Sequence, residues 1–217
     1  MNTFGQNFRI SVLGESHGSL VGVLIDGCPP GISLQPEDFE KDLQRRRSGA
    51  RGTTGRREAD IPEIQSGIYN GHTTGAPILI TTPNQQKRSE DYEVLKDIAR
   101  PGHADFTSQR KFQGFNDPRG GGHFSGRLTF ALVAAGTLAR KLIHPAEVHA
   151  RLIQAGGKSD VEQAVQEAMD RKDSVGGLVE CLTSPLPVGW GEPFFYSLES
   201  AISQLAFAIP AVKGIEF

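Results

Sequence analysis

The chain has 217 residues, a formal net charge of −2 and two cysteines, and 37% of its residues are hydrophobic. This composition predicts a packed core and excludes global disorder. The charge argues against a whole-molecule positive field for nucleic acid, and the cysteines support neither a disulfide framework nor a zinc site. The start lacks the apolar core of a signal peptide, and no stretch approaches the ~18 apolar residues of a membrane span. We therefore expect a cytoplasmic protein without a membrane partner, in which Cys28 and Cys181 are buried thiols.

The apolar pattern predicts short strands and helices with little strict alternation between them. In chain order, the expected elements are strands at 8–13 and 21–26, a helix at 36–47, a loop at 48–58, strands at 61–68 and 76–82, a long loop at 83–126, a buried helix at 127–142, a strand at 147–154, a helix at 159–171, a strand at 176–183, a helix at 198–209 and a strand at 212–217.

Strands in adjacent pairs between helices favour an α+β fold with mixed or antiparallel sheets over a doubly wound fold. No linker is long enough to divide the chain into independent units. Residues 1–217 are therefore expected to form a single domain.

The loop GESHG at 14–18 carries the first candidate for chemistry, His17. A turn flanked by glycines can project a histidine into a cleft, where its proton affinity is easily tuned. The same five residues are equally consistent with a surface turn in which Glu15 is a solvated charge.

Arginines are concentrated in RRRSGARGTTGRRE, residues 45–58, where six of the fourteen residues are arginine. The planar guanidinium suits phosphate and carboxylate, so this loop predicts a site for a small anion. An exposed basic loop, or a non-catalytic module that binds anions or RNA, remains the alternative.

Two further loops contain histidines. In Arg100–Asp105 (RPGHAD), His103 lies near Asp105, which could orient the ring or stabilise its cation. In DPRGGGHFSGR, three glycines precede a helix and could offer backbone N–H groups to an anion, while Phe124 could either stack on a flat cofactor or belong to the core. The other histidines have no ligand spacing, so no metal site is expected; they are His72, His144 and His149.

Taken together, these stretches resemble the chorismate synthase family along essentially the whole chain. The matching segments are GESHG at 14–18, DGCPPGI at 26–32, DLQRRR at 42–47, TTGRRE at 53–58, ARPGHAD at 99–105, the glycines at 120–122 and AVKGIEF at 211–217.

The resemblance implies a β-α-β sandwich, with helices between two mainly antiparallel sheets, that assembles as a homotetramer. It implies a lyase of the shikimate pathway to aromatic amino acids, which eliminates phosphate from 5-enolpyruvylshikimate 3-phosphate to give chorismate. The family requires reduced FMN, and some members reduce the flavin with NADPH.

The resemblance also assigns residues. It makes His17 the proton donor to the leaving phosphate and His103 a residue that acts on the flavin. Arg46 and Arg51 match anion-binding positions for substrate or NADPH, and Arg127 matches a substrate-side arginine. The flavin-contacting triplet corresponds to His123, Phe124 and Ser125, where this chain has GGGHFSGRLT in place of the more familiar GGGRSSARET.

The family pattern continues beyond the segment that matches Phe217, into a glycine-rich region with further flavin and substrate contacts. On this basis we expect a chain truncated at its C-terminus, with weak or no FMN binding and no turnover.

Overall fold

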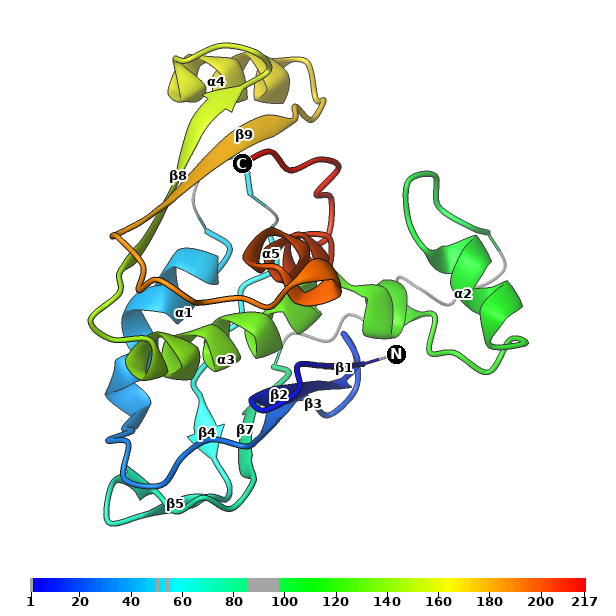
Figure 1. Cartoon of the computed structure of the whole chain (residues 1–217). Coiled ribbons are helices and arrows are strands. Elements are labelled where there is room, and N and C mark those ends of the chain that lie inside the picture. The colour runs from blue at the N-terminus through cyan, green and yellow to red at the C-terminus, as the bar shows by residue number, and fades with distance from the viewer. Residues whose placement is uncertain (1, 50, 54, 86–97) are drawn as a thin grey trace.

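The computed structural model describes residues 2–49, 51–53, 55–85 and 98–217. A five-stranded antiparallel sheet lies at one side, a two-stranded ribbon at the other, and helices lie between them (Figure 1). This arrangement confirms the predicted α+β fold with helices between antiparallel sheets. In spatial order the five strands are β1 (Thr3–Phe4), β2 (Arg9–Gly14), β3 (Leu20–Asp26), β7 (Ile78–Pro83) and β4 (Glu63–Ile64).

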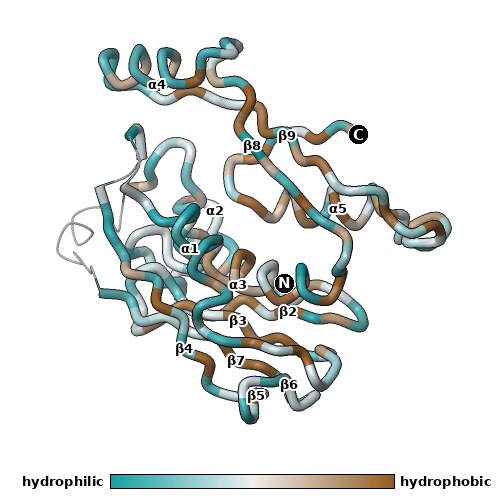
Figure 2. The backbone as a smooth tube through the Cα atoms, turned by 90° about the vertical axis from the view of Figure 1, so that its left-hand side faces the viewer, coloured by the Kyte–Doolittle hydropathy of each residue, from teal (hydrophilic) through white to brown (hydrophobic). Residues whose placement is uncertain are grey.

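The core forms where α3 (Thr129–Leu142) packs against β3 and β2. Alternate residues of a strand point to the same face, so β3 and β7 present one apolar face to the helix. Figure 2 shows the hydrophobic stretches of these strands beneath α3. The fully buried strand residues on this face are Val21, Val23, Ile25, Ile78 and Ile80.

Helix α1 (Glu40–Arg46) follows a 3-10 turn at Pro36–Phe39, where proline suits the first turn because it needs no N–H partner. Phe39 and Leu43 are fully buried and hold α1 against α3. Because α1 ends in arginines and α3 begins beside them, the two helices bring the predicted arginine loop to one end of the sheet.

The second half contributes the ribbon of β8 (Val148–Ala155) and β9 (Gly177–Thr183), with α4 (Val161–Asp170) packed on β8. Helix α5 (Leu198–Ala206) lies on the α3 side of the ribbon in Figure 1. The remaining elements are the small hairpin of β5 (Ile68–Tyr69) with β6 (His72–Thr73), and α2 (Asp105–Lys111). No helix in the described part of the chain is long and apolar enough to cross a membrane.

Three expected elements differ from the structure. Of the strand expected at 61–68, only Glu63–Ile64 pairs with β7. Pro62 has no N–H to donate to the ladder, and after the positive φ of Gly67 the chain turns so that Ile68 joins β5 instead. The loop expected at 83–126 contains α2, while its residues 86–97 lie outside the described part of the chain. Residues 212–217 form no strand, because they pair with no neighbouring strand among the described residues.

The prediction for the two cysteines is half correct. Cys28 is buried, whereas Cys181 is exposed. Cys181 lies in β9, which among the described strands pairs with β8 alone, and every residue of β9 except Glu180 stays exposed. An apolar strand sequence predicted burial that the packing of this ribbon does not provide.

Candidate functional site

The GESHG loop joins β2 to β3 and turns Ser16 and His17 into the protein, while Glu15 is exposed as the surface-turn interpretation expected. Ser16 and His17 are only 1% and 5% exposed, so the surface-turn interpretation is wrong for both. Asn84, which follows β7, donates from Nδ2 to the carbonyls of Glu15 and Gly18 at 2.9 and 3.0 Å. Asn84, at the end of β7, therefore holds the GESHG loop in place on one side.

Arg56 holds the same loop from the other side. Its Nη1 donates to Ser16 Oγ at 2.8 Å and its Nη2 to the Ser16 carbonyl at 2.9 Å. Glu58 fixes the guanidinium in turn, because Oε1 accepts from Arg56 Nε and Nη2 at 2.9 and 2.7 Å. Glu58 Oε2 accepts from the backbone N–H of Gln85 at 2.9 Å. These contacts give a partly buried, charge-assisted network in which each group is held by more than one partner.

The electrostatic environment of His17 favours its neutral form. Burial lowers the pKa of the imidazole below its ordinary value of 6.5, and the nearby charges of Arg56 and Arg119 lower it further. Asp117 and Glu58 oppose this shift without reversing it. His17 is therefore neutral at pH 7 in the free chain.

This shift leads to a prediction about stability. We expect the free energy of unfolding to decrease as the pH falls below about 6.5, because the unfolded chain binds a proton at His17 before the folded chain does. Urea unfolding between about pH 7.5 and 5.5 measures the change, a range in which carboxylates titrate little. The His17→Gln variant should show a smaller decrease, and parallel curves for the two proteins would contradict the assignment.

The glycine run 120–122 packs directly on this histidine. A Cβ placed on Gly120 would lie 2.6 Å from His17 Cδ2 and 2.8 Å from its Nε2. The Gly122 carbonyl accepts from Ser16 N at 3.0 Å. All three glycines have positive φ, and at Gly120 the close approach of the imidazole leaves no room for a side chain.

A second network lies at the start of α3. Arg127 is 6% exposed and pairs through Nη1 with Asp60 Oδ1. Arg46, at the end of α1, pairs with the other oxygen of the same carboxylate. Asn84 connects the two networks, because its Oδ1 accepts from Arg127 Nε at 3.0 Å while its Nδ2 holds the His17 loop. Through Asn84 and Asp60, the structure links the loop that carries His17 to Arg127 and Arg46.

Two nitrogens of this network have no hydrogen-bond partner among the described residues. They are Arg127 Nη2 and Arg46 Nε, and both are buried. Burial lowers the pKa of Arg127, and the Asp60 charge opposes this shift, so the guanidinium stays charged at neutral pH. A buried donor without a partner is costly. The arrangement is therefore suited to an anion that completes it.

Two predicted residues lie apart from this cluster. Arg51 is exposed and donates through Nη2 to Gln166 of α4. His103 is exposed on the α2 segment, where its Nδ1 lies 3.1 Å from the Pro101 carbonyl. Of the two roles expected for Asp105, orienting the His103 ring is not seen, since Asp105 binds Arg100 through N, Nε and Nη2 at 2.8–3.1 Å. Asp105 still interacts with the charge of His103, which contributes to the lowered pKa of this carboxyl after the larger effect of Arg100. The guanidinium is the stronger partner because it offers two parallel donors.

The predicted flavin triplet lies at the junction of the glycine run and α3. His123 Nδ1 lies 2.8 Å from the Gly14 carbonyl, and Ser125 Oγ accepts from Arg127 N at 3.3 Å. The Phe124 ring lies 6.0 Å from that of Phe112 and remains 44% exposed. Phe124 is therefore not a core residue, and its ring is accessible from outside.

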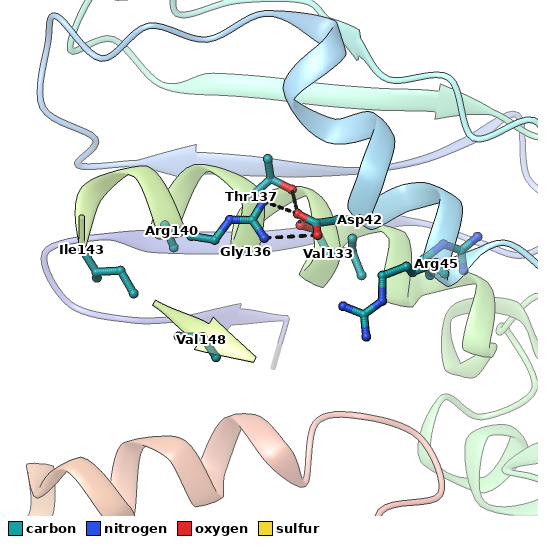
Figure 3. Close-up of a pocket in the computed structure, with 10 residues that line it drawn as sticks. Asp42, Arg45, Val133, Gly136, Thr137, Arg140, Ile143 and Val148 are labelled. Atoms are coloured by element: carbon teal, nitrogen blue, oxygen red, sulfur yellow. Dashed lines mark hydrogen bonds and ion pairs between the residues drawn. The ribbon is translucent and has the colours of Figure 1, made fainter. Parts of the chain in front are cut away.

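A groove with a volume of about 560 Å³ runs between α1, α3 and the start of β8 (Figure 3). Asp42 lies in it and accepts from Arg140 Nη1 and Thr137 Oγ1, both at 3.1 Å. Arg46 lines the same groove, so the cluster that contains Asp60 borders it.

Four residues that build the site were not predicted from the sequence: Arg56, Glu58, Asp60 and Asn84. Arg56 and Glu58 lie in the arginine-rich segment but could not be told apart from its other charges. Asp60 and Asn84 lie in stretches that predict only ordinary strand ends. No local pattern indicates them, because their partners are 14 to 69 residues away.

The fold and this site define a class of α+β proteins with a buried, guanidinium-lined centre beside a neutral histidine. Comparison with known proteins identifies the family, since the chorismate synthase family model matches residues 8–217. The chain belongs to the chorismate synthase family.

Relatives and a solved structure agree with this assignment. A chorismate synthase of Chitinophaga pinensis is 57% identical over 218 residues, covering 100% of this chain and 66% of that protein. A chorismate synthase of Dehalococcoides mccartyi is 44% identical over 246 residues, covering 100% of this chain and 68% of that protein. A crystal structure of a chorismate synthase, 22% identical, shares the fold with a TM-score of 0.74 over 97% of this chain and 68% of that one. The chain thus spans about two thirds of the length of the curated relatives it matches.

Proposed function

We propose that the chain supplies the substrate side of a chorismate synthase active site. There, phosphate is eliminated from 5-enolpyruvylshikimate 3-phosphate to give chorismate with the help of reduced FMN. The observation that carries the proposal is the buried Nη2 of Arg127, which has no partner among the described residues and lies in a network that also holds His17. The identity of the proposed reaction is inferred from membership of the chorismate synthase family.

The charges of the site match those of this substrate. The ester carries one phosphate and two carboxylates, and each is a good acceptor for a guanidinium. Arg46 and Arg127 together share one carboxylate, Asp60, so this group of three retains one net positive charge. A bound anion would offset that charge in a place largely removed from water, where the attraction is stronger than at a surface.

His17 would act at the leaving group. It is neutral in the free chain, and a phosphate dianion beside it would raise the pKa of the imidazole and favour protonation. As the C–O bond to phosphate breaks, a proton held on the ring can pass to the departing oxygen, while the substrate loses a proton from carbon. The networks of Asn84 and Arg56 keep the ring in place during this step.

The residues at 123–125 are compatible with a flavin. The half-exposed Phe124 ring provides an apolar face, and Arg100 Nη2 lies 3.8 Å from the position of a Cβ on Gly121, so a cation borders the same glycine run. We assign His123, Phe124 and Ser125 to the side that holds reduced FMN. Bound there, reduced FMN supplies an electron-rich ring for an elimination without net redox change.

The remaining roles rest on the family pattern. In the proposal, exposed His103 acts on the flavin and exposed Arg51 contacts substrate or NADPH. Neither reaches the His17 cluster directly in the chain as described. The protein is proposed to assemble as a homotetramer, and sedimentation of the 217-residue chain would test that assembly.

The alternative of an RNA-binding arginine loop receives less support. Four of its arginines contact four different segments: Arg45 donates to the Ala150 carbonyl, Arg46 pairs with Asp60, Arg51 contacts Gln166 and Arg56 binds Ser16. An RNA-binding strip requires several guanidiniums on one exposed surface. Here the arginines mainly hold the protein together.

The proposal predicts substrate binding coupled to proton uptake. Calorimetric titration of the chain with 5-enolpyruvylshikimate 3-phosphate near pH 7 should give a binding heat that depends on the ionisation enthalpy of the buffer, because His17 gains a proton when the ester binds. His17→Gln should lose this dependence, and shikimate, which lacks both the phosphate and the enolpyruvyl carboxylate, should bind more weakly. Absence of binding by the ester, together with RNA binding that Arg46→Ala abolishes, would overturn the proposal in favour of the alternative.

A further inference from the structure

Asp60 is the carboxylate that the motifs and the proposed reaction leave without a role. It is 1% exposed, and its two oxygens have different partners, Arg127 Nη1 on Oδ1 and Arg46 Nη2 on Oδ2. Its backbone has a φ of 49°, in the left-handed region that few residues other than glycine adopt. The surrounding structure holds this conformation in place, which is typical of functional positions.

We propose that Asp60 is a positioning residue, which fixes the guanidiniums of Arg46 and Arg127 relative to each other so that their remaining N–H groups meet the anionic substrate. This inference rests on the proposed function for the identity of the anion. The placement of the two guanidiniums can be examined without any ligand.

Each guanidinium has one further hydrogen bond, so Asp60 completes a two-point attachment for both, and the Arg127 guanidinium also lies over the Phe130 ring at 5.9 Å. Arg46 Nη1 donates to Thr129 Oγ1 at 3.3 Å, and Arg127 Nε donates to Asn84 Oδ1 at 3.0 Å. A planar group held at two points cannot turn freely. What remains are Arg46 Nε and Arg127 Nη2, the two buried nitrogens without partners.

Asp60 also makes the proximity of two cations possible. The positive charges of Arg46 and Arg127 repel each other, since Arg46 lowers the pKa of Arg127 while Asp60 raises it. Because Asp60 bridges residues at the end of α1 and the start of α3, it joins two helices that pack on each other. Preorganised donors of this kind bind a charged ligand without the cost of assembling them first.

The variant Asp60→Asn separates positioning from simple electrostatics. Asparagine has nearly the same shape and tolerates the left-handed backbone, but it is neutral and its amide can accept from only one of the two arginines. If Asp60 acted only through its charge, removing a negative charge would tighten the binding of an anion. If it positions the arginines, binding should weaken despite the more positive site.

The experiment uses calorimetry with 5-enolpyruvylshikimate 3-phosphate on the wild-type chain, on Asp60→Asn and on Asp26→Asn. Asp26 provides a matched control because it also pairs with an arginine, Arg9, but at an exposed position on the sheet. We expect binding about tenfold to a hundredfold weaker for Asp60→Asn, and no change for Asp26→Asn. Unchanged or tighter binding by Asp60→Asn would overturn the proposal.

A measurement on the free wild-type chain covers the case in which Asp60→Asn does not fold or the ester does not bind. With 15N-labelled arginine, the Nη signals of Arg127, assigned by their loss in Arg127→Lys, should be resolved because rotation of the guanidinium is restricted. Averaged signals in the free chain would show that the group is not held in place, and would overturn the positioning role. Resolved signals without ester binding would support positioning and count against the proposed substrate.

Discussion

Arg127→Met is expected to lower the free energy of unfolding by about 3 kcal/mol. Methionine fills a similar volume but leaves the fully buried Asp60 paired with Arg46 alone. The substitution also removes Nε, which donates a hydrogen bond to Asn84 Oδ1. Removing one partner of a buried ion pair is costly because the remaining charge is no longer compensated. Urea unfolding at neutral pH measures the loss.

A matched substitution shows whether burial is the reason. Arg9→Met breaks the pair with Asp26 on the sheet, where both side chains are about half exposed. That change should cost less than about 1 kcal/mol, because water screens an exposed pair. Equal losses for Arg9→Met and Arg127→Met would contradict the assignment of Arg127 to a buried structural and binding network.

Gly120→Ala is expected to weaken binding of 5-enolpyruvylshikimate 3-phosphate by at least about tenfold and to lower the free energy of unfolding by about 2–4 kcal/mol. The added methyl group would lie 2.6 Å from the His17 ring, so either the ring or the glycine run must move. Calorimetry and urea unfolding measure the two effects on the same protein.

An alanine substitution at the neighbouring Gly121 distinguishes the steric clash with His17 from the cost of placing a side chain on a backbone with positive φ. Gly121 also has a positive φ, but a Cβ there would meet only ordinary contacts, at 3.8 Å or more. Gly121→Ala should therefore show the backbone cost of about 1–2 kcal/mol alone, with substrate affinity much less affected. If both alanine variants bind the ester equally well, the packing of Gly120 against His17 has no functional consequence.

Much of the fold was predictable from local pattern. The apolar runs at 8–13 and 21–26 became β2 and β3, and the apolar segment at 127–142 became α3 with a short 3-10 start. Burial of one face is visible in such runs because side chains repeat with the period of the element. The strand expected at 212–217 failed because an extended segment becomes a strand only when another strand pairs with it.

For the site, residue type and loop context indicated His17 and an anion site in the arginine-rich loop, whereas the assignment of Arg46, Arg51 and Arg127 came from the family resemblance. Residue type could not distinguish Arg46, which joins the buried cluster, from Arg51, which turns outward to α4. The direction of a long side chain depends on which acceptor lies within reach, here Asp60 for Arg46 and Gln166 for Arg51. The tertiary fold determines which acceptor that is.

The sequence by itself determined the family, the fold class and the chemical kinds of group at the site, since these follow from short-range patterns and from residues whose chemistry is distinctive. Only the tertiary structure decided that Asp60 bridges Arg46 and Arg127, that Asn84 joins them to the His17 loop, and that Asp105 serves Arg100 rather than His103. These contacts connect segments up to 69 residues apart or choose between nearby partners. Their formation depends on the packing of α1 and α3 on the sheet, which no local stretch specifies.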